Sequence, residues 1–470
     1  MKNIINRLVP GLYSFLLLSM GISQQASAEF TSTFKLPEYE KFTLKNGLTV
    51  YLMEQHEVPL IYLSAVFPAG AVKDGDRYGL AALTADGLLF GTSKFTKKQI
   101  EETLDFLGAS YSTSASQEAA EVDMSFVNKD LDQILPILKE IIVHPVFDEQ
   151  EFEKRKKRLL NELELAKERP SRVISAYYSK FLFDQHVYGN PISGTVNGVS
   201  KINAVDLKDF YASNYVPGES AIAIVGDFKT SEMKKRVKAL FKDWKSKGAA
   251  SKAASTDVKP FSKKRLLLVN KDDATETQFL IGGLGIKRSN PDFVPVQVIN
   301  TILGGRFTSW LNDELRVNRG LTYGARSFFR AYKNAGLFAL YSYTRTEKTV
   351  EAIDVALEVY DKLLKQGIDQ ETLKSAQNYI KGQYPPDYET AGDLASLLTE
   401  MFVYDFDESF INNFQKNVDQ MTVEKARHIV QTWFPKENLQ FVLIGKAVEI
   451  REQVKQYGEL TEKEIKADGF

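Results

Sequence analysis

Two short stretches near the start of the chain alternate between apolar and polar side chains. The first has apolar residues at Leu48, Val50 and Leu52, and the second has them at positions 61, 63, 65 and 67. Because successive side chains of a strand point to opposite faces of a sheet, this period of two predicts two strands with one buried face each. The intervening "EQHEVP" is predicted to be the turn between them.

Helical and strand periods then follow each other without the regular order of βαβ units. Apolar residues at Ile100, Leu104 and Leu107 have helical spacing, alternation returns at 122–126, and 131–142 has apolar side chains along one side of a helix. The order strand, strand, helix, strand, helix predicts an α+β fold with a largely antiparallel sheet.

A linker and a repeat predict two homologous domains. Residues 245–264 are rich in Lys, Ser and Ala and offer almost nothing to bury, which is typical of an interdomain linker. On either side of it, 202–228 and 421–447 share the order helix, aromatic residue, proline turn, apolar strand and glycine. A chance likeness is the alternative, but each segment stands near the end of its half. We predict domains at 29–244 and 265–470.

The first 28 residues have the order of a secretory signal peptide. Lys2 and Arg7 precede an apolar stretch containing "FLLLSMGI", and Ala-Ser-Ala at 26–28 provides the small residues of a cleavage site. A membrane anchor is the alternative, but the apolar run is interrupted and shorter than the about 20 residues of a spanning helix. We expect cleavage before Glu29, no membrane anchor in the mature chain and, for a Gram-negative source, a periplasmic protein.

Composition excludes several classes of function. The chain is 43% hydrophobic and 26% charged, as in an ordinary globular protein, and its formal net charge of −1 gives no general attraction to nucleic acid. The absence of cysteine excludes disulfides, thiolate nucleophiles and cysteine-bound zinc. Neither a Gly-x-Ser-x-Gly elbow nor a phosphate-binding lysine loop occurs.

The stretch "GLAALTADGLLFGT" (79–92) has the setting of a metal-binding helix but not its ligands. Ala82 and Asp86 are one helical turn apart, as two zinc ligands would be, and Ala85 stands where a general base would lie. Neither alanine can bind a metal or accept a proton. Asp86 and Glu162 could approach each other, but two carboxylates favour weak Mg²⁺ or Ca²⁺ binding over zinc. The histidines are scattered and predicted to lie on the surface or in turns: His56, His144, His186 and His428.

The second half carries an arginine and a tyrosine four positions apart, Arg319 and Tyr323, on either side of Gly320. If a strand begins at Leu321, both side chains can point into one cavity. A guanidinium and a phenol are both donors, suited to holding a peptide carbonyl or the oxyanion that forms from it. The alternative that the spacing leaves open is a surface arginine and a half-buried strand tyrosine.

Four segments in order resemble the pitrilysin and mitochondrial-processing-peptidase superfamily, zinc peptidases with an inverted His-x-x-Glu-His motif. They are "LKNGLTVYL" (44–52), 79–92, 187–228 and "LGGRFTSWLNDELRVNRGLTYGARS" (303–327). The likeness covers nearly the whole mature chain. It implies two homologous domains of the processing-peptidase α/β-roll type, each a mostly antiparallel sheet flanked by helices.

The resemblance also implies what has been lost from the metal centre. The first zinc histidine falls on Ala82, the catalytic glutamate on Ala85 and the second histidine on Asp86, while the distal zinc glutamate matches Glu162. Three of the four groups are absent. No cofactor is therefore expected in this chain.

The family's second-domain arginine and tyrosine, which hold the substrate, match Arg319 and Tyr323. By this resemblance the chain looks like the non-catalytic, substrate-binding subunit of a secreted heterodimeric zinc peptidase. A homologous partner with His-x-x-Glu-His would hold the zinc, and Arg319 and Tyr323 would stabilise the oxyanion of a peptide or unfolded segment in trans. The alternatives are a stand-alone peptide-binding or structural protein, and a homodimeric hydrolase with a metal near Asp86 and Glu162.

Overall fold

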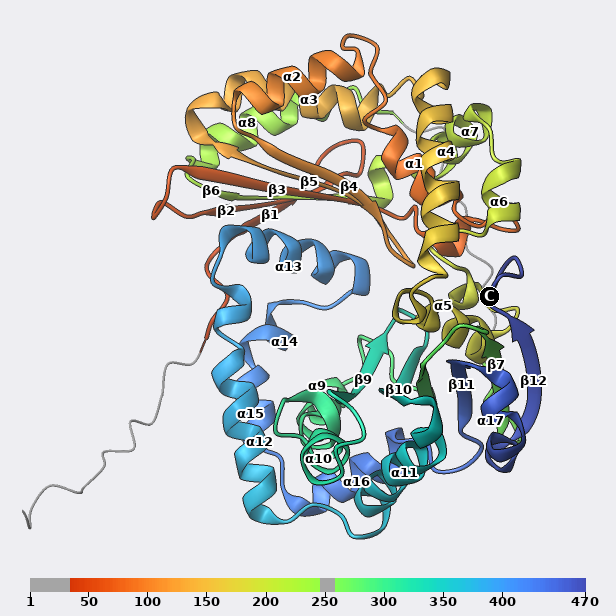
Figure 1. Cartoon of the computed structure of the whole chain (residues 1–470). Helices are drawn as coiled ribbons and strands as arrows, with labels where there is room; N and C mark the ends of the chain where they lie inside the picture. The colour runs from red at the N-terminus through yellow and green to blue at the C-terminus, as the bar shows by residue number, and fades with distance from the viewer. Residues whose placement is uncertain (1–33, 246–257) are drawn as a thin grey trace, which may run out of the picture. The chain divides into compact units, whose positions relative to one another are not determined.

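The computed structural model describes residues 34–245 and 258–470, and within them the chain builds two six-stranded sheets in succession (Figure 1). The strand orders are β1-β2-β6-β3-β5-β4 and β12-β7-β11-β8-β10-β9. The predicted signal peptide lies outside the described residues, as does most of the predicted linker 245–264.

The first sheet is antiparallel except where β2 and β6 run parallel. Helices α2, α3 and α8 cover one of its faces and form a single apolar core with it (Figure 1). The strands are β1 (Glu40–Thr43), β2 (Thr49–Glu54), β3 (Leu60–Phe67), β4 (Ser110–Ala115), β5 (Ala120–Val127) and β6 (Ala221–Gly226). The helices are α1 (Leu80–Gly87), α2 (Lys97–Phe106), α3 (Leu131–Val143), α4 (Glu149–Ala166), α5 (Pro170–Phe183), α6 (Val196–Lys201), α7 (Ala204–Asn214) and α8 (Thr230–Phe241).

The second sheet repeats this plan, with β7 parallel to both β11 and β12. The strands are β7 (Arg265–Asn270), β8 (Glu276–Leu284), β9 (Ala325–Ala331), β10 (Gly336–Arg345), β11 (Gln440–Gly445) and β12 (Glu459–Glu464). The helices are α9 (Phe293–Asn300), α10 (Trp310–Asn312), α11 (Thr349–Lys365), α12 (Gln370–Gln383), α13 (Ala391–Tyr404), α14 (Glu408–Asn412), α15 (Phe414–Asp419), α16 (Val423–Trp433) and α17 (Ala447–Val454). Two π-helical turns adjoin α9 and α10: η5 (Thr301–Gly305) and η6 (Asp313–Asn318).

The predicted repeat is confirmed in three dimensions. Helix α7 leads through a proline turn into β6, and α16 leads through Pro435 into β11. Both strands lie third from the same edge of their sheets, next to β2 in one half and β7 in the other. The predicted α+β class with two mostly antiparallel sheets is therefore correct.

The expectation of one buried face for each of the first two strands is wrong. Residues 49–53 of β2 are all buried, and β6 lies between β2 and β3. The second face of the sheet is covered as well, because α13 of the second half packs against β3 and β6. The alternation seen in the sequence therefore marks two different buried environments.

The two halves exchange one helix each. Helix α5 lies between β5 and β6 of the first sheet along the chain but packs against β8 and β11 of the second, whereas α13 lies between β10 and β11 and packs against β3 and β6 of the first. These strands are equivalent by position in the two sheets. The exchange makes residues 35–470 one compact unit.

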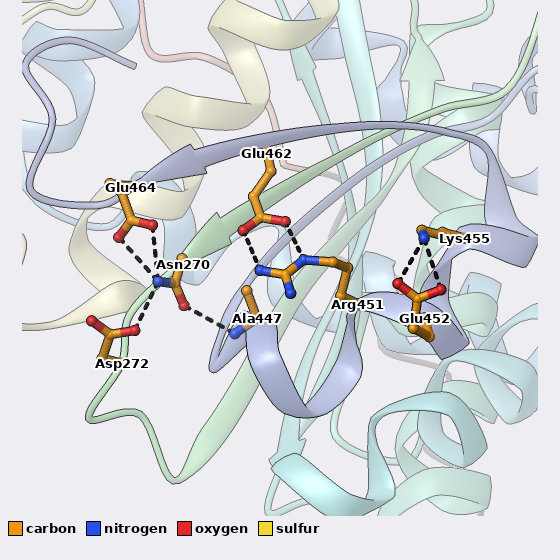
Figure 2. Close-up of polar contacts among 8 residues, drawn as sticks. All are labelled: Asn270, Asp272, Ala447, Arg451, Glu452, Lys455, Glu462 and Glu464. Carbon is orange, nitrogen blue, oxygen red and sulfur yellow. Dashed lines mark hydrogen bonds and ion pairs between the residues drawn. The ribbon is translucent and has the colours of Figure 1, made fainter.

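The outer edges of the sheets differ, because β1 runs antiparallel to β2 whereas β12 runs parallel to β7. Figure 2 shows how the second edge is fastened. The Asn270 amide at the end of β7 donates to Glu464 of β12 at 3.0 Å, and its oxygen accepts from the backbone N–H of Ala447 at 3.0 Å. Arg451 of α17 forms a two-pronged pair with Glu462 at 2.6 and 2.7 Å. Strand β12 has few apolar side chains to pack, and these charge-assisted hydrogen bonds hold it at the edge of the sheet instead.

Candidate functional site

Helix α1 lies at the predicted metal-binding position and is started by a buried aspartate. Gly79 precedes it with φ +99°, a conformation that side chains rarely adopt. The Asp74 carboxylate accepts the backbone N–H groups of Gly79 and Ala81 at 2.8 Å each. Its side chain is almost completely buried, and burial raises its pKa to about 7. The local fold of a metal helix is thus retained.

The side chains at the metal positions do not fit zinc. Ala85 is completely buried in the core of the first half, and Ala82 and Asp86 are half-buried. Alanine offers no lone pair to a metal, so Asp86, at the position of a zinc histidine, is the one of these three side chains that could bind a metal. Across the described ranges, no group of three or more His, Cys, Asp and Glu side chains is placed to hold a metal ion.

Arg155 of α4 connects the two carboxylates that remain. Its Nε donates to the Asp86 carboxylate at 2.6 Å, and a terminal nitrogen donates to Glu162 at 3.2 Å. Burial raises the pKa of the Asp86 carboxyl, and the charge of the guanidinium opposes that rise. The structure therefore brings Asp86 and Glu162 close together, as the sequence suggested. The group between them is the Arg155 guanidinium.

Sequence reasoning missed Arg155, although a signal was present. Arg155 and Glu162 are two helical turns apart on α4, so they share one face of the helix. Once Glu162 is placed beside α1, an arginine on the same face is the obvious partner for a buried Asp86. The surface or turn positions predicted for the histidines do fit His56: it is exposed between Asp227 at 2.7 Å and Glu54 at 3.1 Å.

Arg319 and Tyr323 lie on a loop, and the condition of a strand from Leu321 is not met because β9 begins at Ala325. Arg319 ends the π-helical turn η6, and Gly320 follows with φ +59°. The Thr322 hydroxyl then closes a small turn, accepting the Gly324 N–H at 3.1 Å. These local bonds take up the backbone groups that a strand would need.

Both side chains of this loop face solvent. Tyr323 is 81% exposed, so the alternative of a half-buried strand tyrosine is also wrong. The Arg319 guanidinium is about half exposed and donates from Nε to Glu314 at 2.9 Å. No contact joins Arg319 to Tyr323 in the part of the chain that the structure describes. The pair shares an open surface, and the shared cavity that its spacing suggested is not seen around it.

The same surface carries further side chains suited to contact. Phe307 and Val317 are 67% and 68% exposed, and the Arg316 guanidinium lies over the Phe307 ring at 4.7 Å. Asn312 ties these segments together, because its amide donates to the Phe307 carbonyl at 2.6 Å and its oxygen accepts the N–H at the start of β9 at 3.3 Å. Exposed aromatic and arginine side chains are typical of binding surfaces.

Two family models match consecutive parts of this chain. "Insulinase (Peptidase family M16)" matches residues 49–196, which include α1, and "Peptidase M16 inactive domain" matches residues 201–380, which include the Arg319 loop. The chain belongs to the M16 peptidase family. The resemblance inferred from four sequence segments is thereby confirmed.

Similar M16 proteins are known from several bacteria. The "Uncharacterized zinc protease YmxG" of Bacillus subtilis is 22% identical over 73% of this chain and 83% of its own length. The "Non-peptidase homolog YmxG" of Helicobacter pylori is 23% identical over 83% of this chain and 90% of its own length. The solved "peptidase M16 inactive domain from Pseudomonas fluorescens" is 26% identical, with a TM-score of 0.81, and covers 87% of this chain and 98% of that one.

Family membership explains why α1 is folded without a metal to bind. The chain is an M16 member whose metal helix carries Ala82, Ala85 and Asp86, and whose Asp86 and Glu162 carboxylates both pair with Arg155. It is a pseudopeptidase, because its first half lacks the side chains that would bind zinc and act as the general base. The Arg319 loop of the second half keeps groups that can contact a peptide.

Proposed function

We propose that this chain is the non-catalytic, substrate-binding subunit of an exported heterodimeric zinc metallopeptidase. The observation that carries the proposal is an asymmetry within one chain. On α1 the side chains that would bind zinc are absent, and Asp86 pairs with Arg155. On the other half, Arg319 and Tyr323 are exposed. A relative named "Non-peptidase homolog" supports loss of peptidase activity in chains of this kind.

Arg319 and Tyr323 would act on a peptide held by both subunits. The partner, a homologous subunit with the His-x-x-Glu-His motif, would hold the zinc and its water. From this chain, the tyrosine hydroxyl and the guanidinium would donate hydrogen bonds to the scissile carbonyl and to the oxyanion formed from it. Glu314 accepts from the Nε of Arg319, which leaves the two terminal nitrogens as donors. Substrates would be peptides or unfolded segments.

Export and a periplasmic location, for a Gram-negative source, complete the proposal and rest on the first 28 residues. Among the helices that the structure describes, none has the length and apolarity needed to cross a membrane. Fractionation of cells that express the full chain, with N-terminal sequencing of the product, tests both export and the cleavage site before Glu29.

The divided active site is tested with a quenched-fluorescent unstructured peptide. The chain alone, the motif-bearing homologue alone and their mixture are assayed with and without chelator. We expect cleavage to rise strongly in the mixture and to vanish with chelator. No gain on mixing would favour a stand-alone peptide-binding pseudopeptidase instead. Chelator-sensitive activity of the chain alone would favour a homodimeric hydrolase with a metal near Asp86 and Glu162.

A further inference from the structure

A cavity of about 390 Å³ lies where the two halves meet, and no residue of α1 or of the Arg319 loop lines it. Its wall combines the end of β3, the turn after it, the β4–β5 and β9–β10 turns and the end of α13. Known sites for small ligands have volumes of about 300–1,000 Å³. The cavity is therefore large enough for a small ligand or for one residue of a peptide.

One side of the cavity is apolar. Val66 of β3 is buried, and Phe402 and Val403 of α13 face it across the space as half-buried side chains. This wall suits an aliphatic or aromatic group.

The carboxylate at the rim, Glu118, has its own partners. Both of its oxygens accept the backbone N–H of Lys333 at 3.0 Å, and one also accepts the Tyr188 hydroxyl at 2.5 Å. The same hydroxyl accepts the N–H of Asn334 at 3.0 Å. The β4–β5 turn of one sheet is thus joined to the β9–β10 turn of the other, and this bridge gives the cavity a fixed rim.

Lys73 differs from the other charged groups of the wall. It is half-buried in the cavity, and burial lowers its pKa, with Glu219 acting in the opposite direction through its charge. Within residues 34–245 and 258–470, its ammonium forms no direct hydrogen bond or ion pair, and the charge that acts on it comes from the Glu219 carboxylate of the same wall. A partly desolvated ammonium without a direct partner is costly, and a bound anion in contact with it would lower that cost.

We infer that this cavity binds an apolar carboxylate, with the carboxylate on Lys73 and the apolar group against Val66 and Phe402. A single ammonium beside an apolar wall suits a monoanion better than a phosphate, which has more charge and more oxygens to satisfy. Two sources share this chemistry: the free C-terminus of a peptide that ends in an apolar residue, and a small aliphatic or aromatic acid. The inference does not depend on the proposed heterodimer.

Calorimetric titration of the mature full-length chain tests the site. The probes are N-acetylphenylalanine and its amide, which have the same shape but differ in charge. We expect the acid to bind and the amide to bind at least about tenfold more weakly. Lys73→Met should remove that preference, while Lys98→Met, a change at an exposed lysine of α2, should leave it intact. Phe402→Ala should weaken the acid and the amide together.

A second pair of probes distinguishes the sources: one unstructured peptide with a free C-terminal phenylalanine and the same peptide amidated. Binding of the free peptide as tightly as the small acid would assign the cavity to chain ends. Binding of the small acid alone would assign it to small carboxylates. Equal binding of acid and amide, no binding at millimolar concentrations, or an unchanged preference in Lys73→Met would overturn the inference. The acid and amide comparison uses wild-type protein, so it stands even if a variant fails to fold.

Discussion

The helices exchanged between the halves cover equivalent strands, but they do so with different chemistry. Beneath α5, the contact with the second sheet is apolar and aromatic: Tyr177 and Tyr178 are buried in one cluster with Val442 and Ile444 of β11. The Tyr178 hydroxyl donates to the Phe338 carbonyl of β10 at 2.8 Å. The side chains of this contact are as buried as those of a domain core.

Beneath α13, the contact with the first sheet is more polar and less filled. A cavity of about 340 Å³ lies between α13 and the sheet, lined by Glu121 of β5 and Glu400 of α13, among others. Burial raises the pKa of Glu121 and of Asp123. The Ser64 and Thr399 hydroxyls meet at a long 3.4 Å.

The two halves therefore share a backbone plan while their exchanged contacts differ in chemistry. The α5 contact can hold the halves together as a core does, because it is built from buried apolar and aromatic side chains, although the buried Tyr177 hydroxyl has no hydrogen-bond partner in the described chain. The α13 contact keeps open space and buried carboxylates, which cost stability. The two candidate sites also differ: Asp86 of α1 is paired with Arg155, whereas Tyr323 of the Arg319 loop is exposed.

The largest expected effect is the loss of stability when the α5 contact is truncated. Tyr178→Ala should lower the free energy of unfolding by about 3–5 kcal/mol, because it empties a fully buried aromatic site. Met401→Ala in α13 should cost less, about 2 kcal/mol, since open space already adjoins that helix. Urea unfolding monitored by circular dichroism gives both values. Equal losses would mean that the two contacts are equally tight.

The next effect concerns the Arg319 loop. In the active mixture of subunits, Arg319→Ala or Tyr323→Phe should lower turnover about 10²-fold or more, the usual cost of one lost oxyanion donor. Stability should change by less than about 0.5 kcal/mol because both side chains are exposed. Arg345→Ala, an exposed arginine of β10, is the control and should leave turnover unchanged. Unaltered turnover in the two loop variants would remove the role in trans.

A smaller effect is expected at the neutralised metal helix. Arg155→Met leaves the half-buried Asp86 without its cation and should cost about 1–3 kcal/mol. Adding Asp86→Ala should restore part of that loss, because the unpaired charge disappears. A double-mutant cycle by urea unfolding measures the coupling. Additive losses would show that Arg155 does not compensate Asp86.

Much of the fold could be predicted from periodicity, and the reasons for the failures are physical. The strand at 61–67, the helix near Ile100 and the repeated helix-turn-strand units follow from local patterns that the structure keeps. Burial of the sheet's second face could not be predicted, because its cover over β3 and β6 comes from α13, far along the chain. The polar edge strand β4 carries no apolar signal at all.

At the candidate site, the sequence predicted which groups are absent more readily than where the remaining groups lie. Loss of a ligand at Ala82 and of the general base at Ala85 can be read directly from residue type. The position of Tyr323 could not, since the Thr322 turn and the left-handed Gly320 delay the strand to Ala325. The bonds from Arg155 to Asp86 and Glu162 could not be predicted without knowing that α4 lies beside α1.

The smallest expected effect is a pH-dependent change in stability at the α13 contact. The raised pKa of Glu121 means that its carboxyl binds a proton more tightly in the folded chain than in the unfolded one. Its contribution to stability is therefore present at acid pH and is lost as pH rises through the raised pKa. Glu121→Gln, which mimics the protonated form, should raise stability by up to about 1 kcal/mol at pH 8 and have little effect near pH 4.

Urea unfolding of the wild type, Glu121→Gln and the exposed control Glu102→Gln at pH 4 to 8 measures this dependence. An increase at pH 8 that is specific to Glu121→Gln would show that the α13 contact is held below its possible stability by a buried charge. No replacement of that kind is expected to stabilise the α5 contact, where the buried polar group of Tyr178 already has its acceptor. If Glu121→Gln instead lowers stability at every pH, the carboxylate has partners that stabilise it, and the two contacts are more alike than their side chains indicate.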